Sequence, residues 1–205
     1  MLFHLVVPRI SSFATSISAG PSDESDQALN FIVSNSNSGL FSVQPTIDNT
    51  GKLSYTPAAN ANGSAVVSVQ IHDNGGTANG GVDTSATQTF TINVTAVNDV
   101  PSFVVGSTQT VLEDAGAQSV NSFATSISAG PSDESTQAVN FIVSNSNSSL
   151  FSVQPTVSSS GTLSYTPAAN AFGSATVSVA LMDNGGTANS GVDTSAAQTF
   201  VITVD

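Results

Sequence analysis

A tandem repeat with a period of 110 residues constrains the fold of this chain more than any other feature. Three motifs mark it: SFATSISAGPSDES begins at Ser12 and Ser122, LSYTPAAN at Leu53 and Leu163, and DNGGTAN at Asp73 and Asp183. An ungapped alignment of 11–95 with 121–205 has 66 identities in 85 positions. Since both copies must form the same structure, we expect two similar domains in series, covering 1–97 and 98–205, with a linker around 95–101.

Within each copy, apolar residues alternate with polar ones, which is the period of a β-strand with one buried face. Val177, Val179 and Leu181 alternate in this way with Ser178 and Ala180. Clusters of Gly, Pro, Asn and Ser separate such runs and are typical of turns. The pattern predicts seven strands in the second copy, near 107–113, 118–127, 137–145, 150–157, 161–167, 173–182 and 196–204. We therefore predict an all-β chain of two tandem, seven-stranded immunoglobulin-like β-sandwiches.

The first copy lacks the sequence for its normal first strand, because the equivalent of 108–112 falls mostly before Met1. Residues 1–10, MLFHLVVPRI, match nothing else in the chain and are interpreted as an irregular end of a larger protein. They are too short to span a bilayer and lack the basic start and cleavage site of a signal peptide. Leu2 to Val7 can pair as a substitute edge strand; without it, the first domain has an unprotected edge and lower stability.

Composition excludes several classes of function. The chain has two basic residues, Arg9 and Lys52, and 14 acidic ones, for a formal net charge of −12. Such a charge repels phosphate backbones and anionic lipid, so we expect neither nucleic-acid binding nor membrane insertion. The absence of cysteine excludes thiol catalysis, disulfides and thiolate metal sites.

Acidic and amide side chains are predicted to gather at one end of the second domain. Strand direction alternates in a sandwich, so the loops after the second and sixth strands lie at the end where the linker arrives. Six residues from three segments would then converge: Asn98, Asp99, Asp133, Glu134, Asp183 and Asp193. Calcium prefers six to eight such oxygen ligands, whereas magnesium demands tighter geometry and zinc recruits His or Cys. The alternative is that these carboxylates are merely solvated and that Asp183 caps the DNGG turn.

Four motifs resemble cadherin-like, immunoglobulin-like tandem repeats of large bacterial surface or secreted proteins of the adhesin type. They are AVNDVP at 96–101, LEDAG at 112–116, LSYTPAAN at 163–170 and DNGG at 183–186. The resemblance implies an extracellular or cell-surface stalk whose joints with neighbouring repeats bind calcium. It also implies that Glu113 is a ligand for the downstream joint. The first copy has no counterpart of Glu113, and the second-domain loop has no Asp-x-Asp pair, which favours fewer ions than a cadherin joint holds.

Two functions are weighed: a structural spacer with calcium at the inter-domain junction, and a module that binds carbohydrate or protein through loops at one end. Against the second, the chain has no Trp, and Tyr55 and Tyr165 alternate like core residues, leaving Phe172 as a loop aromatic. We predict no enzyme activity. His72 becomes Met182 in the other copy, and no nucleophile can be identified beside the paired acids of the repeated loop.

Overall fold

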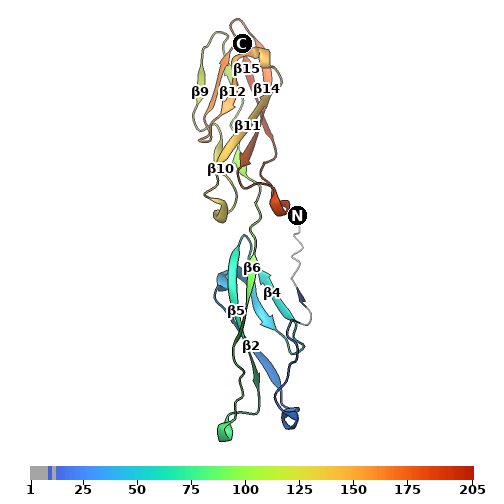
Figure 1. Ribbon diagram of the computed structural model, residues 1–205. Helices are drawn as coiled ribbons and strands as arrows, with labels where there is room; N and C mark the ends of the chain where they lie inside the picture. The colour runs from blue at the N-terminus through green and yellow to red at the C-terminus, as the bar shows by residue number, and fades with distance from the viewer. Residues whose placement is uncertain (1–8, 11–12) are drawn as a thin grey trace. The chain divides into compact units, whose positions relative to one another are not determined.

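The computed structural model describes residues 9–10 and 13–205, and it divides into two compact units, Met1–Ala96 and Val97–Asp205, here called unit 1 and unit 2 (Figure 1). Both units are all-β. The helical segments among the described residues are three-residue 3₁₀ turns: Ser22–Glu24, Ser38–Leu40, Ala78–Gly80, Ser132–Glu134, Ser148–Leu150 and Ala188–Ser190. None of these turns has the length or apolar character needed to cross a membrane. The substitute strand predicted for Leu2 to Val7 lies outside the described residues.

The described residues of unit 1 form two three-stranded antiparallel sheets, ordered β1-β4-β3 and β2-β5-β6. The strands are β1 (Arg9–Ile10), β2 (Leu29–Asn35), β3 (Phe41–Ile47), β4 (Leu53–Pro57), β5 (Gly63–Asp73) and β6 (Gln88–Val94).

Unit 2 repeats these sheets, extends one of them by a fourth strand and adds a separate two-stranded sheet. Its strands are β7 (Ser102–Val104), β8 (Gln109–Val111), β9 (Gln118–Val120), β10 (Thr125–Ser128), β11 (Val139–Asn145), β12 (Phe151–Val157), β13 (Leu163–Pro167), β14 (Gly173–Asp183) and β15 (Gln198–Val204). The sheets are ordered β11-β14-β15-β8, β12-β13-β9 and β10-β7. All pairs are antiparallel except β15 with β8, which is parallel.

The alternation in the sequence places the core as predicted. On β14, Val177, Val179 and Leu181 are fully buried. Tyr165 on β13 is 2% exposed, which confirms its assignment to the core. The all-β, immunoglobulin-like fold predicted from the two-residue period is therefore confirmed.

In unit 2 one predicted strand was wrong in detail and one short strand was missed. The single strand expected at 118–127 is two strands, β9 and β10, and between them Ser122 has a φ of 54°, in the left-handed region and not the extended one. After this break β9 pairs with β13 and β10 pairs with β7, so the two halves belong to different sheets. Strand β7 itself was not predicted, since three residues are too few to establish a period of two.

The two units bury their equivalent residues unequally. Val179 and Leu181 are fully buried and Phe200 is 5% exposed in unit 2. Their equivalents in unit 1, Val69, Ile71 and Phe90, are only partly buried. In unit 2, β7 and the residue after it supply Phe103 and Val105 to the core. Unit 1 has no described strand in the position of β7.

Candidate cation site at the linker end of unit 2

Six of the seven predicted site residues, all except Glu113, lie at one end of unit 2, here called the linker end. It comprises the segment 97–101, the turn 130–137 after β10, and the loop 183–194 between β14 and β15. Asn98 joins these segments, because its side-chain amide donates to Asp183 Oδ1 and to the backbone oxygen of Val192, both at 2.9 Å. Gln137 Nε2 in turn donates to Asn98 Oδ1 at 2.8 Å. The linker segment is thus bound to unit 2 by side-chain hydrogen bonds.

Glu134 is the first of two buried carboxylates at the linker end. It lies on the turn Ser132–Glu134 that follows Pro131, and its Oε1 accepts the backbone N–H of Asp99 at 2.8 Å. The residue is only 5% exposed, and Oε2 has no hydrogen-bond partner. This oxygen lies directly against Gly130, where any side chain would collide with it.

Asp183, at the end of β14, is the second buried carboxylate and is 4% exposed. Its Oδ1 accepts the backbone N–H of Gly185 at 2.8 Å as well as the Asn98 amide. The bond from Gly185 caps the turn, which is the role considered above as the alternative to metal binding. That role does not use Oδ2, which is buried and unpartnered, as is Gln137 Oε1.

The charge of unit 2 makes these carboxylates unusual. Unit 2 contains no Lys, Arg or His, and all eight of its charged side chains are acidic. A buried carboxylate without a partner of opposite charge is costly, and a cation from solution would offset that cost. Carboxylate and amide oxygens are ligands for a hard cation such as calcium. The donor set therefore fits calcium in its chemistry.

The geometry sets a limit on this fit. Across residues 9–10 and 13–205, no three His, Cys, Asp or Glu side chains come close enough together to hold a metal ion by themselves. A cation at the linker end would therefore be coordinated by a mixed set, in which amide and backbone oxygens and water supplement the carboxylates.

The remaining predicted residues are placed differently. Asp193 belongs to the same loop as Asp183: its backbone oxygen accepts the N–H of Asp183 at 2.9 Å, and its Oδ1 accepts the Thr194 hydroxyl at 2.9 Å. Asp99 and Asp133 have exposed side chains in segments beside Glu134. Glu113 is not brought to this end.

Glu113 follows β8, which runs parallel to β15, and its backbone N–H donates to Asp205 O at 2.7 Å. It therefore lies where β15 finishes, whereas the linker end lies where β15 begins. Gln137 was missed by sequence reasoning, although it is identical in both copies and lies three residues after Glu134.

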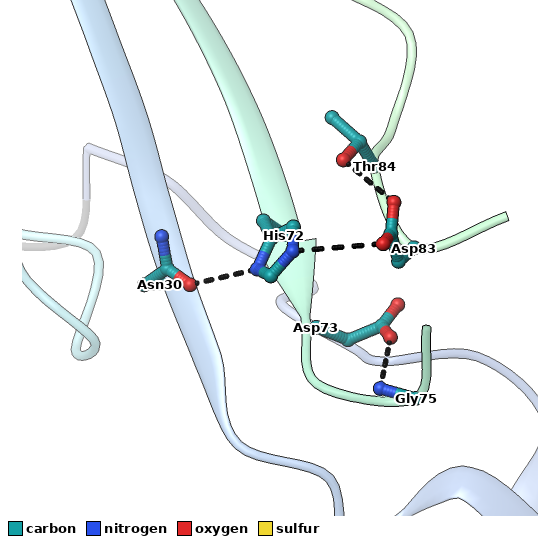
Figure 2. Close-up of polar contacts among 6 residues, drawn as sticks. All are labelled: Asn30, His72, Asp73, Gly75, Asp83 and Thr84. Atoms are coloured by element: carbon teal, nitrogen blue, oxygen red, sulfur yellow. Dashed lines mark hydrogen bonds and ion pairs between the residues drawn. The ribbon is translucent and has the colours of Figure 1, made fainter. Parts of the chain in front are cut away.

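The corresponding end of unit 1 has the same acids in a more open setting. Glu24, Asp73 and Asp83 are all partly exposed there. Asp73 again caps its own turn by accepting the N–H of Gly75 at 2.8 Å, and Asp83 Oδ2 lies 3.7 Å from His72 Nε2 (Figure 2). His72 is on β5 and partly exposed, so it is the surface strand residue that the repeat comparison predicted.

Comparisons with known proteins agree with this architecture. Residues 7–95 match the family described as bacterial Ig domain, and the second copy is nearly identical to the first over 85 aligned positions. Both units are therefore immunoglobulin-like repeats similar to that bacterial family. No curated protein is significantly similar to the chain.

Solved structures with a similar fold include cadherin ectodomain fragments, so the fold is also cadherin-like. Human protocadherin-24 EC1-2 has a TM-score of 0.53 and 15% identity, over 89% of this chain and 85% of that one. Human CDH23 EC21-23 has a TM-score of 0.50 and 16% identity, over 86% and 58%. Mouse protocadherin-24 EC1-3 has a TM-score of 0.47 and 15% identity, and the tandem covers only 58% of it. At these identities the likeness shows the fold alone.

Proposed function

We propose that this tandem is a structural spacer in an extracellular or cell-surface protein of the adhesin type, and that unit 2 binds calcium at its linker end. One observation carries the calcium proposal: Glu134 and Asp183 are buried, each has an oxygen without a partner, and unit 2 has no cationic side chain. The repeat architecture supports the spacer role, since tandem sandwiches separate whatever lies before and after them.

The residues that would hold the ion are those with unpartnered buried oxygens, namely Glu134, Asp183 and Gln137. The acids Asp99, Asp133 and Asp193 add negative charge around them. Bound calcium would supply the positive charge that unit 2 lacks, with a flexible coordination shell of oxygen ligands. Glu134 accepts the N–H of Asp99 and Asp183 accepts from the Asn98 amide, so both carboxylates also bind the linker segment. A calcium ion that stabilised the buried carboxylates would therefore also stabilise the linker segment bound to them. Glu113 belongs to the opposite end and would serve only a following repeat.

The experiment is thermal unfolding of the full chain in calcium and in chelator. Calcium should raise the melting temperature of wild-type unit 2, because a ligand that binds only the folded state stabilises it. In Glu134→Gln this rise should be lost, whereas the variant should be more stable than wild type in chelator, since a buried charge has been removed.

Glu24→Gln is the matched control, because Glu24 is the equivalent residue of unit 1 and is partly exposed. It should keep the full calcium response of unit 2. Equal responses in wild type and Glu134→Gln would reject the proposed site.

A second candidate function is binding of a protein or glycan, and the exposure of Phe172 favours it. This side chain is 79% exposed in the loop before β14. Exposed aromatic rings offer apolar stacking surface to such ligands. The equivalent residue in unit 1 is Asn62, so Phe172→Asn is a substitution that the fold accepts. A glycan or protein screen should lose its signal with Phe172→Asn if this function is correct.

A further inference from the structure

Unit 1 contains an apolar groove whose equivalent in unit 2 is filled by core side chains. The groove has a volume of about 330 Å³, and its apolar lining includes Phe13, Ile17, Phe31, Val69, Ile71 and Phe90. Three of these, Val69, Ile71 and Phe90, are the residues whose equivalents are completely or almost completely buried in unit 2. The groove is therefore core surface that no described strand of unit 1 covers in the way β7 does in unit 2.

Unit 2 shows what covers this surface. Phe103 of β7 is 5% exposed and packs against Phe141, the equivalent of Phe31, with the ring centroids 5.1 Å apart in an edge-to-face arrangement. Val105 packs against the same core. The cover is thus an extended segment that contributes alternate side chains, Phe103 and Val105, to the sandwich interior.

Backbone hydrogen bonds fix that segment in unit 2. Strand β7 pairs with β10, with Thr125 opposite Val104 and Ser128 opposite Ser102. The side chain of Gln198 bonds the segment from the other side: its Nε2 donates to Phe103 O at 2.7 Å and its Oε1 accepts from Val105 N at 3.2 Å.

The same anchor positions are present in unit 1. Gln88, the equivalent of Gln198, lines the groove and is exposed. Thr15 to Ser18, the equivalents of β10, also line it and form no strand. Unit 1 therefore offers a segment, 15–18, with which an incoming strand can pair, and a side chain, Gln88, that can bind the backbone of that strand.

The loops of unit 1 also keep the equivalents of the residues that, in unit 2, contact the segment preceding β7. In unit 2, Asn98 fits against Gly185 and accepts from Gln137. The unit 1 equivalents are Gly75 and Gln27, and Gln27 has a buried Oε1 without a partner. Val82 is 80% exposed, compared with 45% for its equivalent Val192, which bonds the backbone of Asn98 in unit 2.

We propose that unit 1 is a strand acceptor, whose groove and adjoining loops bind an extended segment of the type Val-Asn-Asp-Val-Pro-Ser-Phe-Val-Val supplied by another repeat of this kind. In this mode the incoming strand gains main-chain hydrogen bonds from Thr15 to Ser18, and alternate side chains provide specificity, as in other cases of strand addition to a sheet. The phenylalanine fills the groove and Gln88 binds the backbone beside it.

The test uses the full 205-residue chain and a fluorescent synthetic peptide with the sequence of residues 97–107. The proposal predicts saturable binding of one peptide per chain and new protection of the amides of 15–18 from hydrogen exchange. A peptide with alanine at the position of Phe103 should lose binding. Absence of saturable binding at millimolar peptide would overturn the proposal.

Two matched protein variants locate the site. Gln88→Ala should weaken peptide binding by about tenfold, the effect expected from the loss of one or two ordinary hydrogen bonds. Gln198→Ala should leave peptide binding unchanged, because Gln198 bonds the segment that is already bound within unit 2. The reverse pattern, or new protection at 125–128 in place of 15–18, would show exchange into unit 2 and would contradict the acceptor role of unit 1.

Discussion

Gly185 shows how a single residue determines the linker end. A side chain at this position would overlap the Asn98 amide oxygen, which lies directly against the glycine. Asn98 connects the linker segment with both Gln137 and Asp183. The absence of a Cβ at position 185 is therefore what lets the linker approach the buried carboxylates.

Gly185→Ala should accordingly displace Asn98 and lower the free energy of unfolding of unit 2 by about 1–3 kcal/mol, the cost of leaving buried polar groups unpaired. Chemical denaturation measures this change. The matched control is Gly75→Ala, where the nearest atoms belong to the end of the Gln27 side chain, 2.6 Å from the added carbon, and can move away. A larger loss for Gly75→Ala than for Gly185→Ala would contradict this account.

At Asp48, the two copies use different residues for the same turn. The Thr50 hydroxyl donates to Asp48 Oδ1 and lowers the pKa of this carboxyl, helped by the backbone N–H groups of Lys52 and Thr50. The equivalent Ser158 accepts the N–H of Thr162 with a neutral hydroxyl. The turn in unit 1 is therefore sensitive to protonation and the turn in unit 2 is not.

The folded state favours ionised Asp48, so its contribution to stability is present above the unfolded-state pKa and is lost as the pH falls through the lowered folded-state pKa. Asp48→Ser should remove this part of the acid sensitivity of unit 1 while the turn still forms. Denaturation curves from neutral to strongly acidic pH measure it. An unchanged acid dependence in Asp48→Ser would exclude the carboxylate as the cause.

At the scale of elements, long alternating strands could be predicted and short ones could not. The five strands β11 to β15 follow runs of apolar alternation, and their order brings the two acidic loops and the linker to one end, as the sequence indicated. The break at Ser122 and the short strand β7 depend on tertiary pairing, which a local pattern does not contain. For the same reason, the acids could be assigned to one end, but the burial of Glu134 could not be read from the sequence.

Strand β7 is predicted to be a major source of stability in unit 2. Phe103→Ala should lower its free energy of unfolding by about 3–5 kcal/mol, because a buried aromatic side chain is replaced by a cavity. Val104→Ala is the control: Val104 is on the same strand but 54% exposed, and its truncation should cost less than about 0.5 kcal/mol. Similar losses for the two variants, measured by denaturation, would show that β7 is not part of the core.

The whole chain combines two units with the same sequence pattern and unequal cores. The buried cluster of unit 2 has fifteen residues, whereas that of the described part of unit 1 has five. Since stability rises with buried apolar area, unit 1 should unfold at a lower temperature than unit 2. Scanning calorimetry of the full chain should resolve two transitions, and Phe103→Ala should move only the upper one. A single transition that moves as a whole would contradict independent units.

Calcium binding at the linker end is the central claim, and its most direct test is a calorimetric titration of the full chain with calcium. The variants to compare are Asp183→Asn and its unit 1 equivalent Asp73→Asn, which change the same turn in the two copies. We expect saturable binding in wild type and Asp73→Asn, and its loss in Asp183→Asn, because only Asp183 is buried with an unpartnered oxygen. No binding at millimolar calcium, or equal binding in all three proteins, would show that the buried acids of unit 2 are not a calcium site.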